Sequence, residues 1–256
     1  RRCVLQRQRL HRLDRPRLGG IRTVVDDPQS DSVRAMFTRI ADRYDLMNSL
    51  MTGGRHHAWR RRVAAAVTGV PAGPVLDLAT GTADLAIAVR ARDPARFVAG
   101  ADFSERMLHV GAAKLEARRV TRVRLLAADA LGLPFRDGAF ACVMSAFLLR
   151  NLEHLEAGLQ EMRRVTMKGG RVVTLDIVTP AVPVWGALFG AYFNRVVPLV
   201  GALVAGDRRA YTYLPQSVER FVTPFELARL MEKAGLREVS YHRLGLGTIA
   251  VHAGVV

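Results

Sequence analysis

The sequence predicts an α/β fold in which a mostly parallel sheet has helices on both faces and ends in an antiparallel hairpin. The 256 residues, half of them hydrophobic, suffice for one large domain with a core. Between positions 74 and 178, apolar runs alternate with helical patterns, as is typical of parallel sheets. Near the end, the predicted strands 237–244 and 247–256 are joined by a Gly-Leu-Gly link, which is short enough for a hairpin.

The segment before the sheet is predicted to be helical. Residues 31–48 place apolar side chains at helical spacing, and a second helix is expected over 59–67. Pro71 and Pro74 then mark the link to the first strand.

The alternating region is predicted to hold five strands, and the hairpin adds two more. The five strands are expected over 74–79, 96–102, 123–129, 138–149 and 171–178. Helices are expected over 82–91, 104–117, 152–165 and, before the hairpin, 223–236. Ser104 and Thr223 are the predicted N-caps of two of these helices, and Gly169 and Gly170 are expected to end the third.

An almost wholly apolar run, residues 181–206, interrupts the alternation, and Arg195 is its only charge. Its length would suit a membrane span, but Pro183 and Pro198 interrupt it and the strand pattern resumes afterwards. We therefore expect a buried pair of helices or an apolar lid over a hydrophobic substrate, within an insertion that covers residues 181–215.

The net charge and the number of cysteines limit the class of protein to which the chain can belong. The chain has 38 lysines and arginines against 23 acidic residues. Such an excess indicates a nucleic-acid partner, contact with an anionic membrane surface, or a role in solubility alone. Eight arginines and one acid fall in the first 24 residues, so residues 1–30 are interpreted as a disordered basic arm. Cys3 and Cys142 are interpreted as free thiols in a reducing, cytoplasmic compartment, and no metal site is predicted.

Three strand ends carry the residues that suggest a ligand. The first strand runs into a turn that contains Gly81 and Thr82, and the second ends at Asp102, 21 residues after Gly81. The third ends at Asp129 and Ala130. Ligands of open α/β sheets bind outside the carboxyl ends of the strands, where a carboxylate at this spacing accepts hydrogen bonds from ribose hydroxyls. Asp129 and Ala130 are then suited to meet an adenine amino group.

The turn itself is poor in glycine, and this composition favours S-adenosylmethionine over a dinucleotide as the ligand. A pyrophosphate favours several glycines and bare N–H groups, whereas S-adenosylmethionine has no phosphate. Asp77, before the turn, suits a cation better than a pyrophosphate. A single acid after a strand is commonly just a helix cap. The prediction of a nucleoside ligand therefore depends on the consistent spacing of all three strand ends.

These residues also carry a resemblance to a known family. The segments "VLDLATGTADLA", "GADFSERML", "AADALGLPFRDGAFACV" and "FLLRNL" resemble class I S-adenosylmethionine-dependent methyltransferases. The segments "MFTRIADRYDLMNSLMTGGRHHAWRR", "YTYLPQSVERF" and "GTIAVHAG" are more narrowly similar to the ubiquinone/menaquinone biosynthesis C-methyltransferases. The resemblance implies a Rossmann-like, seven-stranded methyltransferase domain over residues 31–256. It implies S-adenosyl-L-methionine as cofactor, with contacts at Thr82, Asp102, Asp129 and Ala130.

The chain departs from the family pattern at several positions. Ala83 and Leu148 stand where the family has glycine, and Ala146 stands where some members have a serine that contacts the cofactor. The methyl group of Ala83 is expected to crowd the cofactor. These differences leave the substrate open.

The resemblance implies C-methylation of a polyprenyl quinol ring, demethylmenaquinol or a related compound. Arg150 and Asn151 are candidates to orient or polarise the quinol oxygen, with the alternative that Arg150 pairs with a nearby acid. His56, His57 and His154 are candidate bases on chemical grounds alone.

Other functions remain open at this stage. An RNA methyltransferase is disfavoured because the basic residues cluster in the arm, so no nucleic-acid partner is expected. The alternatives are a methyltransferase on another lipid, for example phosphatidylethanolamine N-methylation, and a non-catalytic S-adenosylmethionine-binding paralogue. A polyprenyl substrate and a basic chain favour peripheral contact with an anionic membrane surface at its inner face. The sequence leaves the oligomeric state open, a homodimer included.

Overall fold

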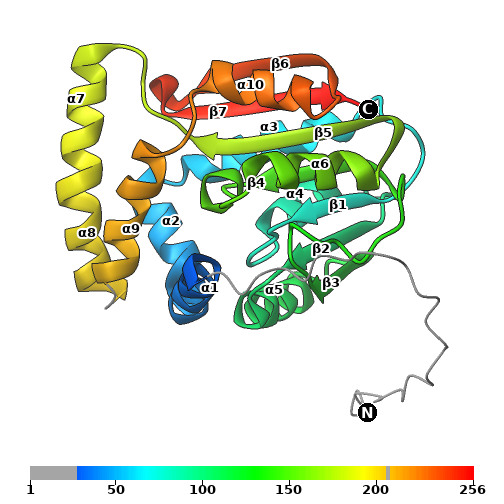
Figure 1. Cartoon of the computed structure of the whole chain (residues 1–256). Coiled ribbons are helices and arrows are strands. Elements are labelled where there is room, and N and C mark those ends of the chain that lie inside the picture. The colour runs from blue at the N-terminus through cyan, green and yellow to red at the C-terminus, as the bar shows by residue number, and fades with distance from the viewer. Residues whose placement is uncertain (1–27, 206–207) are drawn as a thin grey trace, which may run out of the picture.

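The computed structural model describes residues 28–205 and 208–256, and this part of the chain forms a seven-stranded sheet with helices on both faces (Figure 1). The strands are β1 Val75–Leu78, β2 Val98–Asp102, β3 Val123–Ala127, β4 Phe140–Ala146, β5 Thr166–Ile177, β6 Arg237–Leu244 and β7 Ile249–Val255. Their order is β3-β2-β1-β4-β5-β7-β6. β1 to β5 are parallel, and β7 pairs antiparallel with β5 and β6, which confirms the predicted sheet and hairpin.

Helices connect the strands much as predicted. They are α1 Pro28–Ile40, α2 Tyr44–Thr52, α3 Arg55–Ala64, α4 Asp84–Arg92, α5 Glu105–Ala117, α6 Leu155–Val165, α9 Arg208–Glu219 and α10 Pro224–Lys233. The single helix expected over 31–48 is divided into α1 and α2 by a 3₁₀ turn at Ala41–Arg43. The arm predicted over residues 1–30 lies outside the described residues, apart from its last three positions, which belong to α1. Ser104 and Thr223 accept hydrogen bonds from backbone N–H groups as the predicted N-caps.

The alternating side chains of β1 show how the sheet is held between two helical layers. Val75 packs into a core with α3 and α4, whereas Leu76 and Leu78 pack on the other face with α6 and α10. All three side chains are fully buried, as expected for a central strand of a parallel sheet.

The double glycine does not end a helix, contrary to the prediction. α6 ends at Val165, and β5 begins directly at Thr166 with Gly169 and Gly170 inside it. Gly169 has a φ of 73°, and a Cβ on Gly170 would lie 2.7 Å from the carbonyl oxygen of Met167. The glycines therefore allow a bulge, which shifts the register of β5 against β4.

The apolar run is not the buried helical pair that the sequence suggested. It forms one helical segment, which consists of α7 Pro183–Ala191, the π turn η4 Tyr192–Val196, α8 Val197–Val200 and the π turn η5 Gly201–Ala205. Pro198 does not interrupt it, because the wider hydrogen bonding of η4 precedes α8 and a proline is tolerated in a first helical turn. One face packs inward through Phe193 and Val197, while much of the opposite face is exposed.

A third core lies on the side toward which the arrow of β5 points (Figure 1). It joins α1 and α2 from the start of the chain to the segment 183–205 and to α9. Ile40, Met47, Phe193, Val197 and Val218 are among its buried members. These helices therefore cover the carboxyl ends of the parallel strands, where ligands of such sheets bind.

Candidate active site

The acid inside the first strand stabilises the turn that follows it. Asp77 is buried, and its Oδ2 accepts hydrogen bonds from Thr80 Oγ1 at 2.6 Å and from the backbone N–H of Ala86 at 2.9 Å. Burial raises the pKa of Asp77 to about 7. Oδ2 thus ties the turn to the first residues of α4, whereas Oδ1 is buried without a hydrogen-bond partner among the described residues.

The predicted ribose acceptor lies beside the same turn. Asp102 ends β2, and its Oδ2 accepts a hydrogen bond from the backbone N–H of Gly81 at 2.8 Å. Its Oδ1 accepts a hydrogen bond from the backbone N–H of Ser104 at 2.9 Å. The structure therefore brings together Gly81 and Asp102, which are 21 residues apart in the sequence.

The third strand end is open to solvent. Asp129 is exposed just beyond β3, and its Oδ1 accepts a hydrogen bond from the backbone N–H of Leu131 at 2.9 Å. Ala130 follows and is partly buried. Because β3 and β2 are adjacent and parallel, these residues lie at the same edge of the sheet as Asp102.

Two of the departures from the family pattern fit into the core. Ala83 adopts a φ of 66°, a region that glycine favours, and its side chain is fully buried. A Cβ on Gly111 of α5 would lie 3.4 Å from that of Ala83, so the alanine methyl group packs toward α5. The expectation that this methyl group crowds the cofactor is therefore wrong. Leu148 is buried in the core that contains α6.

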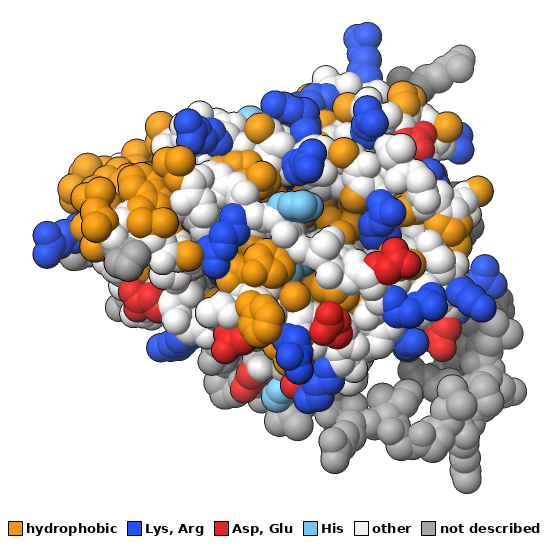
Figure 2. Space-filling model, turned by 90° about the horizontal axis from the view of Figure 1, so that it is seen from above, with side chains coloured by type: hydrophobic (Ala, Val, Ile, Leu, Met, Phe, Trp, Pro, Cys, Tyr) orange, Lys and Arg blue, Asp and Glu red, His pale blue; other side chains and the backbone are white. Residues whose placement is uncertain are grey.

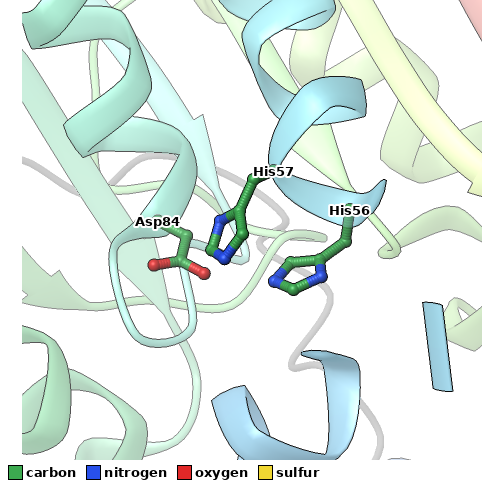
Figure 3. Close-up of side chains that lie close together, drawn as sticks. All are labelled: His56, His57 and Asp84. Atoms are coloured by element: carbon green, nitrogen blue, oxygen red, sulfur yellow. The ribbon is translucent and has the colours of Figure 1, made fainter. Parts of the chain in front are cut away.

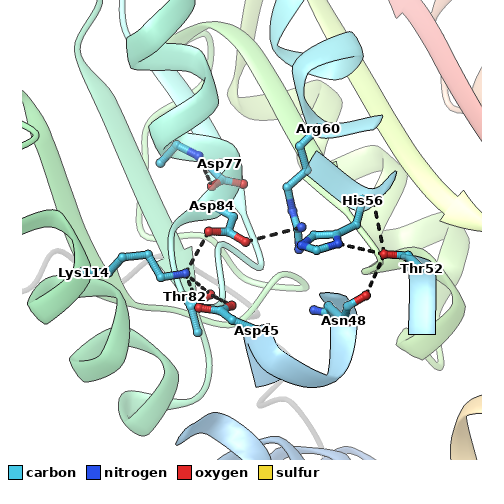
Figure 4. Close-up of polar contacts among 10 residues, drawn as sticks. Asp45, Asn48, Thr52, His56, Arg60, Asp77, Thr82, Asp84 and Lys114 are labelled. Atoms are coloured by element: carbon cyan, nitrogen blue, oxygen red, sulfur yellow. Dashed lines mark hydrogen bonds and ion pairs between the residues drawn. The ribbon is translucent and has the colours of Figure 1, made fainter. Parts of the chain in front are cut away.

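A charged network closes α2 over the turn, and sequence reasoning missed it (Figure 4). Thr82 donates a hydrogen bond from its Oγ1 to Asp45 at 2.6 Å and accepts one from the ammonium of Lys114 at 2.8 Å. Lys114 also forms ion pairs with Asp45 and Asp84. Lys114 follows the buried Gly111 at i+3, so its spacing on the inward face of α5 was the available signal.

A largely apolar cavity of about 140 Å³ lies next to this turn. Its wall includes Phe37, Met51, Trp59, Phe147, Phe189 and Phe193. Tyr44 also lines it, and a Cβ on Gly81 would lie 3.9 Å from the Cε1 atom of Tyr44. The cavity and the turn are therefore separated by one aromatic side chain.

The predicted pair Arg150 and Asn151 lines the cavity at the end of β4. Arg150 forms a buried ion pair with Asp176 at 2.5 Å, and its Nε is buried without a hydrogen-bond partner. Asn151 donates from its amide to the carbonyl oxygen of Phe147 at 3.0 Å and accepts from the hydroxyl of Tyr213 at 3.3 Å. The alternative pairing of Arg150 with an acid is thus present, and it holds the guanidinium against the cavity wall.

The three candidate histidines lie in different surroundings. His56 is buried and lines the cavity, whereas its neighbour His57 is exposed and lies with its ring 3.9 Å from that of His56. His154 is exposed at the start of α6 and does not line the cavity. Of the three, only His56 contacts the cavity.

A sheet of this order, with a glycine-poor turn after β1 and a carboxylate at the end of β2, defines a class I S-adenosylmethionine-dependent methyltransferase. The fold agrees with a solved structure of such a methyltransferase from Aquifex aeolicus. The TM-score is 0.59 at 18% identity, covering 83% of this chain and 98% of that one. A second solved structure, the [4+2]-cyclase SpnF, gives a TM-score of 0.66 at 17% identity over 89% of this chain and 97% of that one. At these identities the likeness concerns the fold alone.

The particular family follows from sequence comparison. Residues 23–256 match the model of the ubiE/COQ5 methyltransferase family, and the chain belongs to that family. It is 45% identical to a demethylmenaquinone methyltransferase of Thermus thermophilus over 86% of this chain and 99% of the relative. It is 38% identical to a ubiquinone/menaquinone biosynthesis C-methyltransferase of Methylobacterium nodulans, over 92% of this chain and 94% of the relative.

Proposed function

We propose that this protein methylates a ring carbon of a polyprenyl quinol, demethylmenaquinol being the first candidate, with S-adenosylmethionine as methyl donor. The cofactor supplies an electrophilic methyl group on a sulfonium. The new bond would form between this methyl group and the ring carbon, S-adenosylhomocysteine would leave with the electron pair of the broken bond, and the proton of the ring carbon would pass to a water molecule. The protein has to align the two reactants and exclude water.

The observation that carries the proposal is the apolar cavity beside the turn, which ends at polar groups. The aromatic wall suits a quinol ring and the start of an isoprenoid tail. The names of the relatives, demethylmenaquinone methyltransferase among them, indicate the same substrate class.

Arg150 and Asn151 are proposed to hold the quinol oxygen. Asp176 and Tyr213 fix the two side chains, so their positions do not depend on the substrate. The positive charge of Arg150 favours a phenolate oxygen, which increases electron density on the ring carbon. Gly81, Thr82, Asp102, Asp129 and Ala130 are proposed to hold the cofactor.

Labelled S-adenosylmethionine and a panel of demethylated quinols test the proposal. We expect one quinol to be methylated on a ring carbon, with phosphatidylethanolamine as the control lipid. Transfer of the label to phosphatidylethanolamine without any methylated quinol would contradict the proposed substrate. Product mass and ring position identify the reaction.

We further propose that the protein is cytoplasmic and touches the inner face of the membrane through the segment 183–205. The helix Val184–Val204 is long and apolar enough to cross a bilayer, and 22% of its most apolar window is buried in the protein. Six exposed side chains recur at helical spacing, which are Val184, Leu188, Tyr192, Val196, Leu199 and Leu203. We call them the apolar stripe, and Figure 2 shows hydrophobic side chains gathered at this end of the molecule.

The position of the apolar stripe supports lipid as its partner. Phe189 and Phe193 of the same helical segment line the cavity, and Tyr192 of the stripe lines it as well, so the stripe and the cavity wall meet on one helical segment. The exposed Arg195 lies within the segment and is suited to anionic headgroups. A polyprenyl tail could then pass from lipid into the cavity along a single helix. Sedimentation with vesicles tests this contact, with stronger binding expected for anionic than for neutral lipid.

A further inference from the structure

Buried polar atoms without a hydrogen-bond partner among the described residues gather near the turn; besides Nδ2 of Asn48 and Oδ1 of Asp77, three such atoms lie where α3 meets α4. They are Nε2 of His56, a terminal guanidinium nitrogen of Arg60 and Oδ2 of Asp84. The Arg60 nitrogen and the Asp84 oxygen are 3.4 Å apart as an ion pair without hydrogen-bond geometry (Figure 4). Buried polar atoms are nearly always paired, so three orphans in one place indicate a missing ligand or water.

The proton positions on His56 follow from its neighbours. The hydroxyl of Thr52 donates its only proton to the carbonyl oxygen of Asn48 at 2.6 Å. Nδ1 of His56, which lies 2.8 Å from the same hydroxyl oxygen, must therefore donate to it. Burial and then the charge of Arg60 lower the pKa of His56 to about 4, so the ring is neutral near pH 7. Nε2 is then a bare acceptor.

The three orphans thus consist of one charged donor, on Arg60, and two acceptors, on His56 and Asp84. Burial alone would raise the pKa of Asp84, but Arg60 and Lys114 lower it below its usual value, so its carboxylate is charged. A ligand that fits must carry a carboxylate for Arg60 and an ammonium for the two acceptors. The amino-acid end of S-adenosylmethionine has both groups on one carbon.

A metal ion fits this place less well. His56, His57 and Asp84 offer three ligand atoms within 4.8 Å of one another, and one nitrogen of His56 points toward the other two residues (Figure 3). Asp84 already lies between two cations, Arg60 at 3.4 Å and Lys114 at 2.8 Å. A dication would add two positive charges beside them, whereas a zwitterion adds none.

The position also fits the cofactor. Asp84 is the first residue of α4, directly after the turn, and the guanidinium of Arg60 lies 5.7 Å from the ring centroid of Phe147 in the cavity wall. The orphans therefore lie between the nucleoside turn and the substrate cavity.

We propose that Arg60, Asp84 and His56 form the subsite for the amino-acid end of the cofactor. Arg60 donates to the α-carboxylate, and Asp84 and Nε2 of His56 accept from the α-ammonium. This inference rests on the proposed function, because it assumes the same cofactor.

Calorimetry of the full chain tests the subsite with two ligands. S-adenosylhomocysteine carries the amino-acid end, and 5′-methylthioadenosine lacks it. In Arg60→Met we expect the affinity for S-adenosylhomocysteine to fall by about 10- to 100-fold, the loss of one hydrogen bond to a charged group, with that for 5′-methylthioadenosine unchanged. Arg61→Met, an exposed change on the same helix, is the matched control and should alter neither affinity.

The outcomes separate the two proposals. A wild-type chain that binds neither ligand overturns the proposed function and the subsite with it. If the wild-type chain binds both ligands and Arg60→Met weakens both equally or neither, the subsite alone is overturned. Arg60 then has only a structural role, as an ion pair with Asp84 or as a partner of bound water. If Arg60→Met does not fold, Arg60→Lys replaces it, with a smaller loss confined to S-adenosylhomocysteine expected.

Discussion

Replacement of one leucine of the apolar stripe by glutamate should weaken the binding of the protein to vesicles. The side chain of Leu199 is 60% exposed, so a membrane has most of it left to bury. Full burial of a leucine contributes about 1.5–3 kcal/mol, which gives about 1–2 kcal/mol for this exposed part. Leu199→Glu should therefore lower the vesicle affinity by about 10-fold, and more once the cost of placing a charge at the acyl boundary is added.

Co-sedimentation with vesicles at rising lipid concentration measures this effect. Phe225→Glu is the matched control, because Phe225 is a large apolar side chain of α10 that is 61% exposed and lies outside the apolar stripe. It should leave the affinity unchanged. Equal binding by Leu199→Glu and the wild type, or an equal loss in Phe225→Glu, would refute the assignment of this helix to the membrane.

Three further results are expected. Arg150→Met should remove most of the methyl transfer in the labelled assay and should destabilise the protein by about 3–5 kcal/mol in urea unfolding, because it leaves Asp176 buried without its partner; a variant with wild-type stability and turnover would contradict this. Asp102→Ala should abolish S-adenosylhomocysteine binding in calorimetry, since it removes both the ribose acceptor and the partner of two backbone N–H groups; retained affinity would exclude the ribose contact. Burial lowers the pKa of His252 to about 4 from 6.5, so the unfolded chain takes up this proton first, and stability should be complete above about pH 6.5 and fall by about 3 kcal/mol toward pH 4. His252→Gln should reduce the fall toward pH 4 by this amount, while groups such as His56, whose pKa is lowered likewise, still contribute the rest; an unchanged profile would assign the loss to other groups.

Periodicity predicts the sheet because its strands are local and strongly patterned. Asp102 and Gly81 were also found from sequence, since strand ends in a parallel sheet meet at one edge. Other features depend on packing that a linear pattern does not contain. At the bulge around Gly169, the glycines allow a close approach of two backbone segments. In the sequence, the same pair of glycines after a helical pattern is equally typical of a helix C-cap.

The charged groups around the turn show the same limit. Asp45, Arg60 and Lys114 come from three helices, and no spacing along the chain relates them. Only the closure of α2 and α3 over α4 and α5 reveals that they neutralise one another. The apolar run was ambiguous for a different reason, because a face that meets lipid and a face that meets a core have the same composition.

The walls of the cavity come from parts of the chain that are distinct from the sheet edge where the nucleoside is proposed to bind. The N-terminal helices and the segment 183–205 with α9 supply most of these walls, whereas the strand ends supply the turn and its carboxylates. Evolution can therefore change the helices around the cavity, and with them the substrate, while the residues at the strand ends that are proposed to hold the cofactor stay the same. A chimaera that exchanges only the segment 183–205 and α9 between two relatives should take the substrate preference of the donor of these helices and the cofactor affinity of the donor of the rest of the chain.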